Sequence, residues 1–409
     1  MARLLLIAVV LVLSSCSYLK PKPADEQAKI SPLCKCEEAA VKPEVAKIPD
    51  YSLLKAADWN ALEEFTKDDL TQAWPAWLLG CSVLKNKPAW QKVCAEAEKV
   101  KDVNQSSIAE YLRKNFTVYQ ASNMDGSETG LITGYYEPIL KASRTKRGPY
   151  RYPLYARPDD LITVELASLF PELANKRVRG RVVGNKLIPY FNRGEIEADQ
   201  SPLKGREIAW VDEQIDLFFL QIQGSGMLHF DNGEKMHVGY ADQNGQSYQS
   251  IGRLLIDQGE LTADKASMQG IKNWAKNNPK KVQALLNANP SYVFFRELPA
   301  GLPGPIGALG SPILAERVVA VDPKFVPLGA PVFLSTNFPF TSQPLQRLMM
   351  AQDTGGAIKG GVRADFFWGA GNEAGKQAGS MKQRGKIWVL LPKDFPFPKN
   401  GNGNGKKAL

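Results

Sequence analysis

Short apolar runs separated by glycine and proline dominate two long stretches of the chain, and this pattern limits the folds that it can adopt. Between residues 130 and 245 the runs 131–136, 182–183 and 217–223 are short and strand-like, so we expect a β-rich module there. After Pro290 the pattern predicts five more strands, at 292–295, 317–321, 331–334, 345–351 and 386–391. Short strands joined by Gly/Pro turns favour a small barrel.

Helical periodicity marks the segments on either side of the first β-rich stretch. Residues 51 to about 120 predict helices, with a break between two of them at Gly80 and 86–88 and a later helix that starts at Ser106 or Ser107. Helical spacing returns between 250 and 287. We therefore expect a mainly β protein with helical segments.

The first sixteen residues resemble an export signal with a lipid-attachment site. Arg3 precedes the apolar run 4–13, and Ser14-Ser15 lead into Cys16. This order resembles a bacterial lipobox, which implies that a signal peptide (1–15) is cleaved and that Cys16 is lipidated. Ser17 resembles the outer-membrane sorting pattern, so we expect an outer membrane lipoprotein that faces the periplasm. The alternative is an ordinary cleaved signal with an incidental cysteine.

Export makes disulfides plausible among the remaining cysteines. Cys81 and Cys94 form the better pair, because each belongs to an apolar helical face and the two faces adjoin the predicted break. Two buried thiols are the open alternative, since connectivity does not follow from sequence. Residues 16–50, which contain Cys34 and Cys36, read as a lipidated cysteine and flexible tether, and 396–409 as a flexible tail.

Composition narrows the classes of function. The chain has 51 Lys plus Arg against 42 Asp plus Glu, a formal net charge of +9, but the basic residues are scattered among acids. Nucleic-acid binding usually gathers basic residues in a stripe or arm, so we expect no nucleic-acid partner. With two histidines, His229 and His237, and no Cys/His cluster, we expect no metal and no cofactor.

The residues that suggest chemistry are aspartates in glycine-rich surroundings. Asp353 precedes the glycines of 355–360, and Asp365 is followed by three aromatic residues, whose desolvating effect would raise a carboxyl pKa toward that of a general acid. Asp322 follows a third predicted strand. A turn-forming role for these aspartates is the alternative. The glycines lack the spacing of a phosphate-binding loop.

These aspartate motifs resemble the three signatures of the three-aspartate, double-psi β-barrel domain. They lie at 322–329, 353–360 and 365–369. Further segments are similar to hallmarks of the membrane-bound lytic murein transglycosylase A family, and the match runs from about 130 to 392. These segments are 131–138, 208–226, 250–252 and 290–295.

The resemblance implies a double-psi β-barrel domain interrupted by a second β-domain, with a substrate groove between them. It implies a helical N-terminal part of the barrel domain at 51–135, the inserted β-domain at 136–245, and helices with the barrel at 246–395. The implied activity is cleavage of the bond between N-acetylmuramic acid and N-acetylglucosamine in peptidoglycan, leaving 1,6-anhydro ends. By family pattern the single acid is Asp365, with Asp353 orienting it or the substrate and Asp322 plausibly structural.

Other motif residues are candidates for the groove walls. Thr133, Tyr135 and Tyr136 offer a hydroxyl and flat rings for sugar contacts, and Gln223 and Ser225 add polar groups. Ordinary strand packing is the alternative for the two tyrosines. Glu137 is a rival acid, although a solvated glutamate at a turn is the favoured interpretation.

Two other functions stay open at this stage. A barrel-type glycoside hydrolase would need a second carboxylate across the groove from Asp365. A noncatalytic murein-binding lipoprotein would bind glycan without cutting it. The expected partners are peptidoglycan glycan strands, the outer membrane through the lipid anchor, and other cell-wall enzymes.

Overall fold

A computed structural model describes residues 49–62, 64–170, 173 and 178–398. The predicted signal peptide, Cys16, most of the tether and the end of the tail lie outside these residues. The described residues belong to one compact unit. Within the described part of the chain, no helix is both long enough and apolar enough to cross a membrane.

Three helices precede the first long strands. They are α1 (Leu70–Leu84), α2 (Pro88–Ala97) and α3 (Gln105–Asn115). Two predicted boundaries were wrong: Gly80 lies inside α1, and α3 is capped by Asn104, whose side chain accepts from the backbone N–H groups of Ser106 and Ser107. Asn is as good an N-cap as Ser, so the neighbouring serines were a misleading signal. Short 3-10 turns occupy Tyr51–Leu53, Trp59–Ala61, Phe65–Lys67 and, later, Pro279–Lys281.

A disulfide joins Cys81 of α1 to Cys94 of α2. Both cysteines are buried in the main hydrophobic core, with 5% and 1% of their surface exposed. Of the two possibilities for these cysteines, a disulfide or two buried thiols, the structure therefore has the disulfide.

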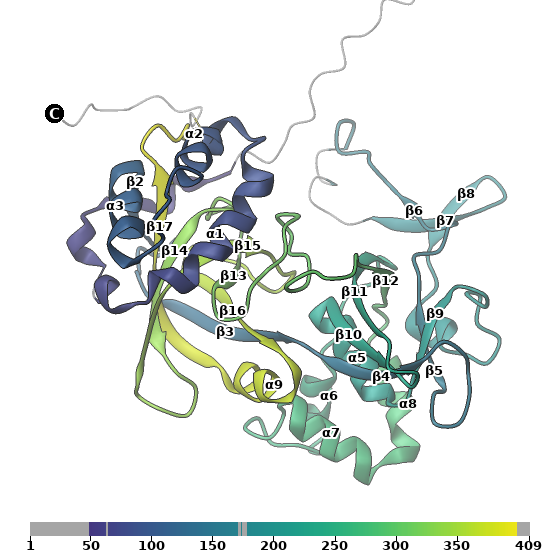
Figure 1. The fold of residues 1–409 in the computed structure, drawn as a ribbon. Coiled ribbons are helices and arrows are strands. Elements are labelled where there is room, and N and C mark those ends of the chain that lie inside the picture. Colours follow the sequence, from purple (N-terminus) through teal and green to yellow (C-terminus); the bar gives the residue numbers. More distant parts are fainter. Residues whose placement is uncertain (1–48, 63, 171–172, 174–177, 399–409) are drawn as a thin grey trace, which may run out of the picture. The chain divides into compact units, whose positions relative to one another are not determined.

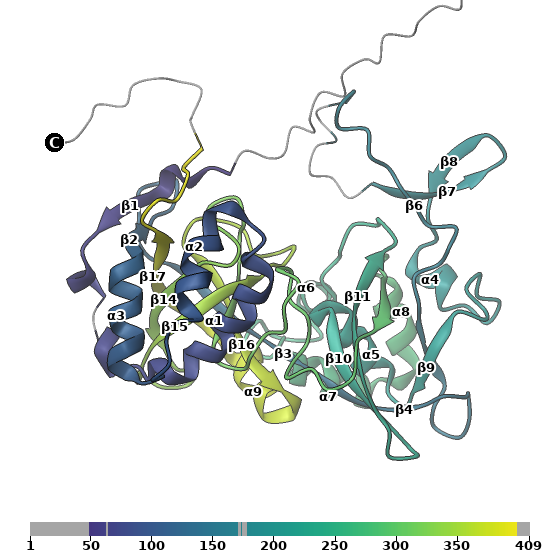
Figure 2. The ribbon, with the colours of Figure 1, turned by 45° about the horizontal axis from the view of Figure 1, so that its top comes forward.

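Six strands form a closed circuit of hydrogen-bonded pairs. The sheet contains β1 (Leu54–Ala57), β2 (Phe116–Ala121), β3 (Gly130–Glu137), β13 (Val318–Val321), β14 (Pro331–Asn337), β15 (Pro344–Asp353), β16 (Arg363–Ala370) and β17 (Lys382–Pro392). Its order is β1-β2-β17-β14-β15-β13-β16-β3, and a further pairing of β17 with β3 closes the last six strands on themselves. Figure 1 and Figure 2 show α1 beside β15 and α3 beside β2. Such closure is what a barrel requires; its double-psi topology stays a prediction.

The chain leaves this circuit after β3 and returns at β13, so a second β-domain is inserted between them. The second sheet contains β4 (Ile139–Ser143), β5 (Tyr152–Tyr155), β9 (Glu207–Val211), β10 (Ser225–Phe230), β11 (Lys235–Gln243) and β12 (Val293–Glu297), in the order β12-β11-β10-β4-β9-β5. A three-stranded sheet contains β6 (Ile162–Thr163), β7 (Arg179–Val183) and β8 (Lys186–Pro189). The remaining helices are α4 (Arg193–Ile196), α5 (Gln214–Gln223), α6 (Ile251–Asp257), α7 (Met268–Asn277), α8 (Val282–Asn287) and α9 (Gly371–Ser380).

One strand prediction was wrong, and one predicted strand lies in the other sheet. Residues 217–223 belong to the helix α5, because this run is buried on several sides and a short apolar run does not distinguish a strand from a buried helix. Leu217 and Leu220 face the core of the second sheet, whereas Phe218 and Phe219 pack with α6–α8. The predicted strand at 292–295 exists as β12, but it pairs with β11 in the second sheet and not with the closed circuit.

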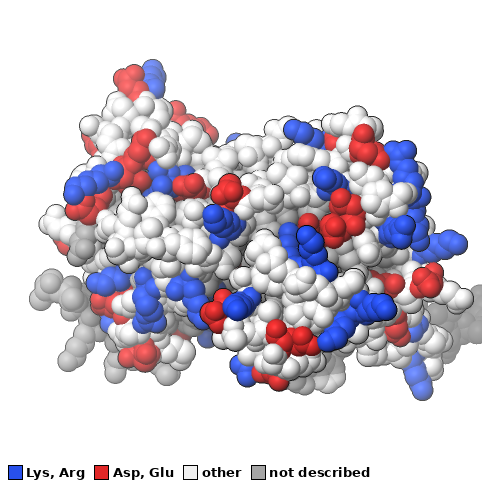
Figure 3. Space-filling model, turned by 90° about the horizontal axis from the view of Figure 1, so that it is seen from below, with Lys and Arg blue, Asp and Glu red and all other residues white. Residues whose placement is uncertain are grey.

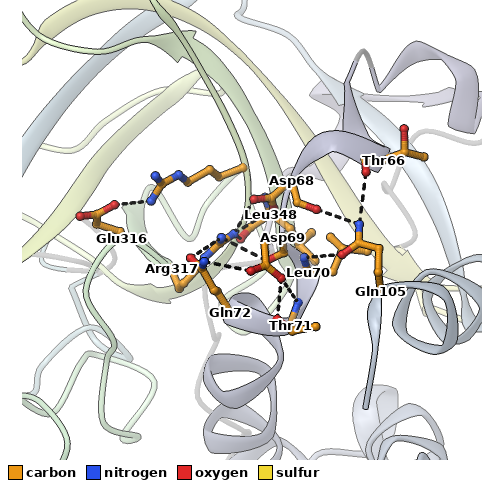
Figure 4. Close-up of polar contacts among 11 residues, drawn as sticks. Thr66, Asp68, Asp69, Leu70, Thr71, Gln72, Gln105, Glu316, Arg317 and Leu348 are labelled. Carbon is orange, nitrogen blue, oxygen red and sulfur yellow. Dashed lines mark hydrogen bonds and ion pairs between the residues drawn. The ribbon is translucent and has the colours of Figure 1, made fainter. Parts of the chain in front are cut away.

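A buried ion pair ties the start of α1 to the closed circuit (Figure 4). The Arg317 guanidinium donates to both carboxylate oxygens of Asp68 at 2.9 Å, and the backbone N–H of Leu348 donates to the same carboxylate at 2.7 Å. The second guanidinium nitrogen donates to the Asp69 carbonyl and to Gln72. The two ionic side chains are only 4% and 5% exposed, so each depends on the other for compensation.

We expect Asp68→Ala to lower the free energy of unfolding by about 3–5 kcal/mol, because it leaves the buried Arg317 charge unpaired. Urea denaturation measures the loss. Lys99→Ala is the control, since it removes an exposed ion pair with Glu96 and should cost no more than about 1 kcal/mol. Equal losses of unfolding free energy in the two variants would show that the buried ion pair matters no more to stability than the exposed one.

Candidate active site

Asp365 lies on β16 between two strands of the closed circuit. It is opposite Thr133 of the parallel strand β3 and opposite Ala320 of the antiparallel strand β13. The Thr133 hydroxyl donates a hydrogen bond to Oδ1 of Asp365. Burial raises the pKa of Asp365, the hydrogen bond from Thr133 and the Arg363 charge oppose this rise, and the Asp353 charge adds to it. The structure thus brings together two residues that the sequence placed 232 positions apart.

Arg363 is a site residue that the sequence analysis did not assign. Its Nη2 donates to the Thr133 hydroxyl oxygen at 2.9 Å. Because this oxygen accepts from Arg363, its single proton is free to be donated to Asp365. Oδ1 of Asp365 is therefore an acceptor, and the proton of a neutral Asp365 belongs on Oδ2. Arg363 and Asp365 lie two positions apart on one strand, so the sequence could place both on one face, but it could not show the bond from Arg363 to Thr133.

Asp353, the last residue of β15, has both carboxylate oxygens engaged by protein donors. Oδ1 accepts from the backbone N–H groups of Ala308 at 3.0 Å and Thr354 at 2.9 Å. Oδ2 accepts from the Tyr135 hydroxyl at 3.0 Å. Burial raises the pKa of Asp353, while these three donors favour its ionised form. The carboxylate of Asp353 is consequently fixed in place by three hydrogen bonds, in the same site as Asp365.

Asp322 follows β13 and joins two turns. Its carboxylate accepts from the backbone N–H of Lys324 at 3.2 Å and of Gly360 at 3.0 Å. Gly360 has φ +121°, a conformation that disfavours a side chain, so this glycine allows the turn between Asp353 and Asp365. These contacts make Asp322 a hydrogen-bond acceptor that links the two turns, and its structural role stays a prediction.

Aromatic residues lie on both faces of β16 around Asp365. Tyr135 and Phe367 lie 5.0 Å apart between ring centroids, and they share strand faces with Thr133 and Asp365 respectively. Phe367 is 2% exposed. Phe366 and Trp368 are also buried, and their rings are 4.6 Å apart. Of the three aromatic residues that follow Asp365, Phe367 shares its strand face, whereas Phe366 and Trp368 lie on the opposite face.

Tyr136 and Gln223 contact each other. Tyr136 is 7% exposed, its hydroxyl lies 3.0 Å from the Met268 sulfur, and a Cβ on Gly375 would lie 2.9 Å from its ring. This ring therefore follows the packing alternative. Gln223 ends α5 and accepts from the Tyr136 backbone N–H at 3.2 Å, so it supports β3. Ser225 begins β10 opposite Gly239 and is half-buried.

Glu137 is buried, so the interpretation as a solvated turn residue was wrong. It ends β3 immediately before Pro138, only 2% exposed, and its Oε1 lies 3.2 Å from Nδ1 of His237 on β11. Burial raises the pKa of Glu137 to about 7 and lowers the pKa of His237. A glutamate before proline was expected to turn outward, but here the chain passes directly from the first sheet into β4 of the second.

We expect the free energy of unfolding to fall between pH 5 and pH 8 as Glu137 ionises. Its folded pKa of about 7 exceeds the ordinary 4.5, so the folded state binds more protons in this interval and loses stability as pH rises. Glu137→Gln should remove up to about 3 kcal/mol of this decline. Denaturation at the two pH values measures it, with the exposed Glu110→Gln as control. If the free energy of unfolding of Glu137→Gln fell with pH as much as that of the wild type, the decline would be due to other groups.

Among the described residues, no group of three or more His, Cys, Asp or Glu side chains could hold a metal ion.

The closed circuit of strands carries three aspartates and is interrupted by a second β-domain, which is the architecture expected of a three-aspartate barrel domain with an inserted domain. Accordingly, the MltA specific insert domain matches residues 131–296 and the 3D domain matches residues 317–391. Membrane-bound lytic murein transglycosylase A of Escherichia coli K12 is 34% identical over 280 residues, which are 66% of this chain and 68% of that protein. The chain belongs to the membrane-bound lytic murein transglycosylase A family.

Solved structures agree with this assignment. MltA from Neisseria gonorrhoeae superposes with a TM-score of 0.75 at 38% identity, covering 84% of this chain and 93% of that one. E. coli MltA with bound chitohexaose has a TM-score of 0.62 at 27% identity, covering 80% of this chain and 91% of that one. The mainly β architecture with an inserted domain is thus shared with these proteins.

Proposed function

We propose that this chain is a lytic transglycosylase that cleaves the β-1,4 bond between N-acetylmuramic acid and N-acetylglucosamine in peptidoglycan and leaves 1,6-anhydro ends. The family assignment supports the reaction class, and the chitohexaose in the E. coli relative supports a glycan as ligand. The observation that carries the proposal is the contrast between Asp365 and Asp353. Both oxygens of Asp353 are occupied, whereas among the described residues no donor contacts Oδ2 of Asp365.

In the proposed mechanism, one carboxyl group performs both proton transfers. Neutral Asp365 donates its Oδ2 proton to the departing glycosidic oxygen as the bond from C1 to that oxygen breaks. The 6-hydroxyl of the same muramic acid then forms a bond to C1, and its proton returns to the Asp365 carboxylate. No water is consumed, and the acid is restored in its protonated form. Asp353 supports this cycle as a fixed negative charge that disfavours early ionisation of Asp365.

The other site residues have supporting roles in the proposal. Thr133 holds Oδ1 of Asp365, and Arg363 holds the Thr133 hydroxyl, so that Oδ2 faces the reaction. Tyr135 holds Asp353, and its ring offers a surface for a sugar. Ser225 remains a candidate sugar contact, whereas Tyr136 and Gln223 act through the packing of β3.

Glycan hydrolysis is the rival reaction, and it needs a second carboxylate as base or nucleophile. Asp353 is poorly suited to that work, because its lone pairs already accept three hydrogen bonds. Mass spectrometry of sacculi digested with the protein distinguishes the functions. Anhydro ends would support the transglycosylase, reducing ends would replace it with a hydrolase, and uncut glycan that still binds would leave a noncatalytic murein-binding lipoprotein.

For localisation, we propose a lipid anchor at Cys16 in the outer membrane, with the enzyme facing the periplasm. The curated relatives are named as membrane-bound, and this supports attachment to a membrane. Figure 3 shows basic side chains interspersed with acidic ones on the face seen from below. The net charge of +9 suits a polymer whose stem peptides carry carboxylates.

A further inference from the structure

Gln352 precedes Asp353 on β15, and its side chain points away from the site. It is fully buried, and its Nε2 donates to the carbonyl oxygen of Ala76 in α1 at 2.7 Å. Successive residues of a strand face opposite sides. At the end of β15, Gln352 therefore contacts the helix from one face of the strand, and Asp353 makes its contacts in the site from the other face. Figure 1 shows α1 alongside β15.

Gly80 makes room for this amide. A Cβ at Gly80 would lie 2.5 Å from Nε2 of Gln352, closer than real side chains approach. Gly80 is inside α1 and is not among the glycines with positive φ, so the backbone does not require a glycine here. Glycine in a helix interior costs about 1 kcal/mol relative to alanine. The glycine that resembled a helix break in the sequence is explained by the space that Gln352 occupies.

The same strand end is held from another side by the segment 307–309. The Leu309 backbone N–H donates to the Gln352 carbonyl at 2.9 Å, and the Ala308 N–H donates to Oδ1 of Asp353 at 3.0 Å. A Cβ on Gly307 would lie 2.6 Å from the Gln352 carbonyl oxygen. Asp353 is consequently fixed between this segment and α1.

Helix α1 is itself restrained next to this contact. Cys81 follows Gly80 directly, and its disulfide fixes α1 to α2. A helix that is restrained by a disulfide thus contacts Gln352. Gln352 in turn is covalently linked to Asp353, which shares the site with Asp365. Movement of the amide would be transmitted to Asp353 through one peptide unit.

We propose that Gln352 is a positioning residue of the active site and that, seated against Gly80, it fixes Asp353 relative to Asp365. The inference rests on the proposed function, because it assigns Gln352 a part in the same reaction. Gln352 touches neither the substrate nor the acid, and it acts only through Asp353. A misplacement of about 1 Å can cost on the order of 10²-fold in rate.

The test compares Gln352→Leu, Gly80→Ala and the double variant in the full-length protein. On a soluble glycan strand, each single variant should lower kcat at least about tenfold, leave KM nearly unchanged and shift the pH profile. The double variant should be no worse than Gln352→Leu alone, because Gly80 matters only while the amide is present. Thermal unfolding monitors the fold, and Gln352→Val, whose side chain also stops short of the Nε2 position, replaces Gln352→Leu if the latter does not fold.

Two matched controls separate positioning from general disturbance. Gly379→Ala also changes a helical glycine, but nothing lies within 4 Å of its added Cβ, and Gln346→Leu removes an amide near the other end of β15. Both should retain wild-type kcat and pH profile. Folded Gln352→Leu with wild-type kcat and pH profile, or additive losses in the double variant, would overturn the inference.

A failure of the proposed function would look different. In that case the wild type itself would form no anhydro product. The carboxyl titrations of Asp353 and Asp365, followed by NMR of ¹³C-labelled aspartate, would still judge the positioning role. A shift of either titration in Gln352→Leu supports the inference, and unchanged titrations contradict it.

Discussion

Asp365→Asn is expected to reduce the formation of 1,6-anhydro product by about 10²- to 10⁴-fold, the usual weight of a general acid. The amide keeps the shape of the carboxyl group and can still accept from Thr133 at the Oδ1 position. It has no acidic proton to donate to the departing oxygen. Mass spectrometry of the products released from sacculi measures the loss, and co-sedimentation with sacculi should show that binding persists.

Asp394→Asn is the control for this substitution. It makes the same chemical change at an exposed residue that pairs with Lys92 on the surface. Its activity and its thermal unfolding should equal those of the wild type. Full activity in Asp365→Asn would remove Asp365 from the mechanism and return attention to Asp353 as the acid.

Much of the fold could be predicted because its strands and helices have local signals. The runs at 131–136, 331–334 and 386–391 became β3, β14 and β17, and the helical spacing between 250 and 287 became α6–α8. The closure of the circuit had no local signal, since β17 pairs with β3 across some 250 residues of chain. The strand β16 was also missed as a strand, because its aromatic residues and glycine drew attention as a motif.

The site shows the same division between local motif and distant contact. Asp353 and Asp365 could be named from their glycine-rich surroundings and the family resemblance. The roles of Thr133 and Arg363 could not, because the bond between Thr133 and Asp365 depends on the register between β3 and β16. A register is set by the packing of whole strands and not by the residues that happen to meet.

Glu137 illustrates the opposite error, where a local rule was followed too far. A charged residue before proline usually lies at a solvated turn, yet Glu137 is buried where β3 passes into the second sheet. Only the insertion of a domain at this point explains its burial. The residue is therefore informative about architecture, although it contacts neither aspartate of the site.

The second large effect is expected from Thr133→Val, which keeps the shape of the side chain but removes the hydroxyl between Arg363 and Asp365. The loss of a hydrogen bond to the carboxylate that develops as Asp365 gives up its proton should lower kcat about 10- to 100-fold, because Oδ1 is no longer held. The pH profile should also change. Asp365 must start protonated, so activity is lost as pH rises through the pKa of its carboxyl group.

The direction of this change follows from the contacts. The Thr133 hydroxyl and the Arg363 charge both lower the pKa of Asp365, so their removal should raise it and move the alkaline limb of the pH profile to higher pH. Arg363→Met should move the limb the same way, since it removes the cation but keeps the hydroxyl. Thr163→Val, at an exposed position of β6, should leave the profile unchanged. An alkaline limb that moves to lower pH in Thr133→Val would show that losing the hydroxyl lowers the pKa of the titrating group, which is opposite to its effect on Asp365, and the assignment of Asp365 as the protonated acid would fail.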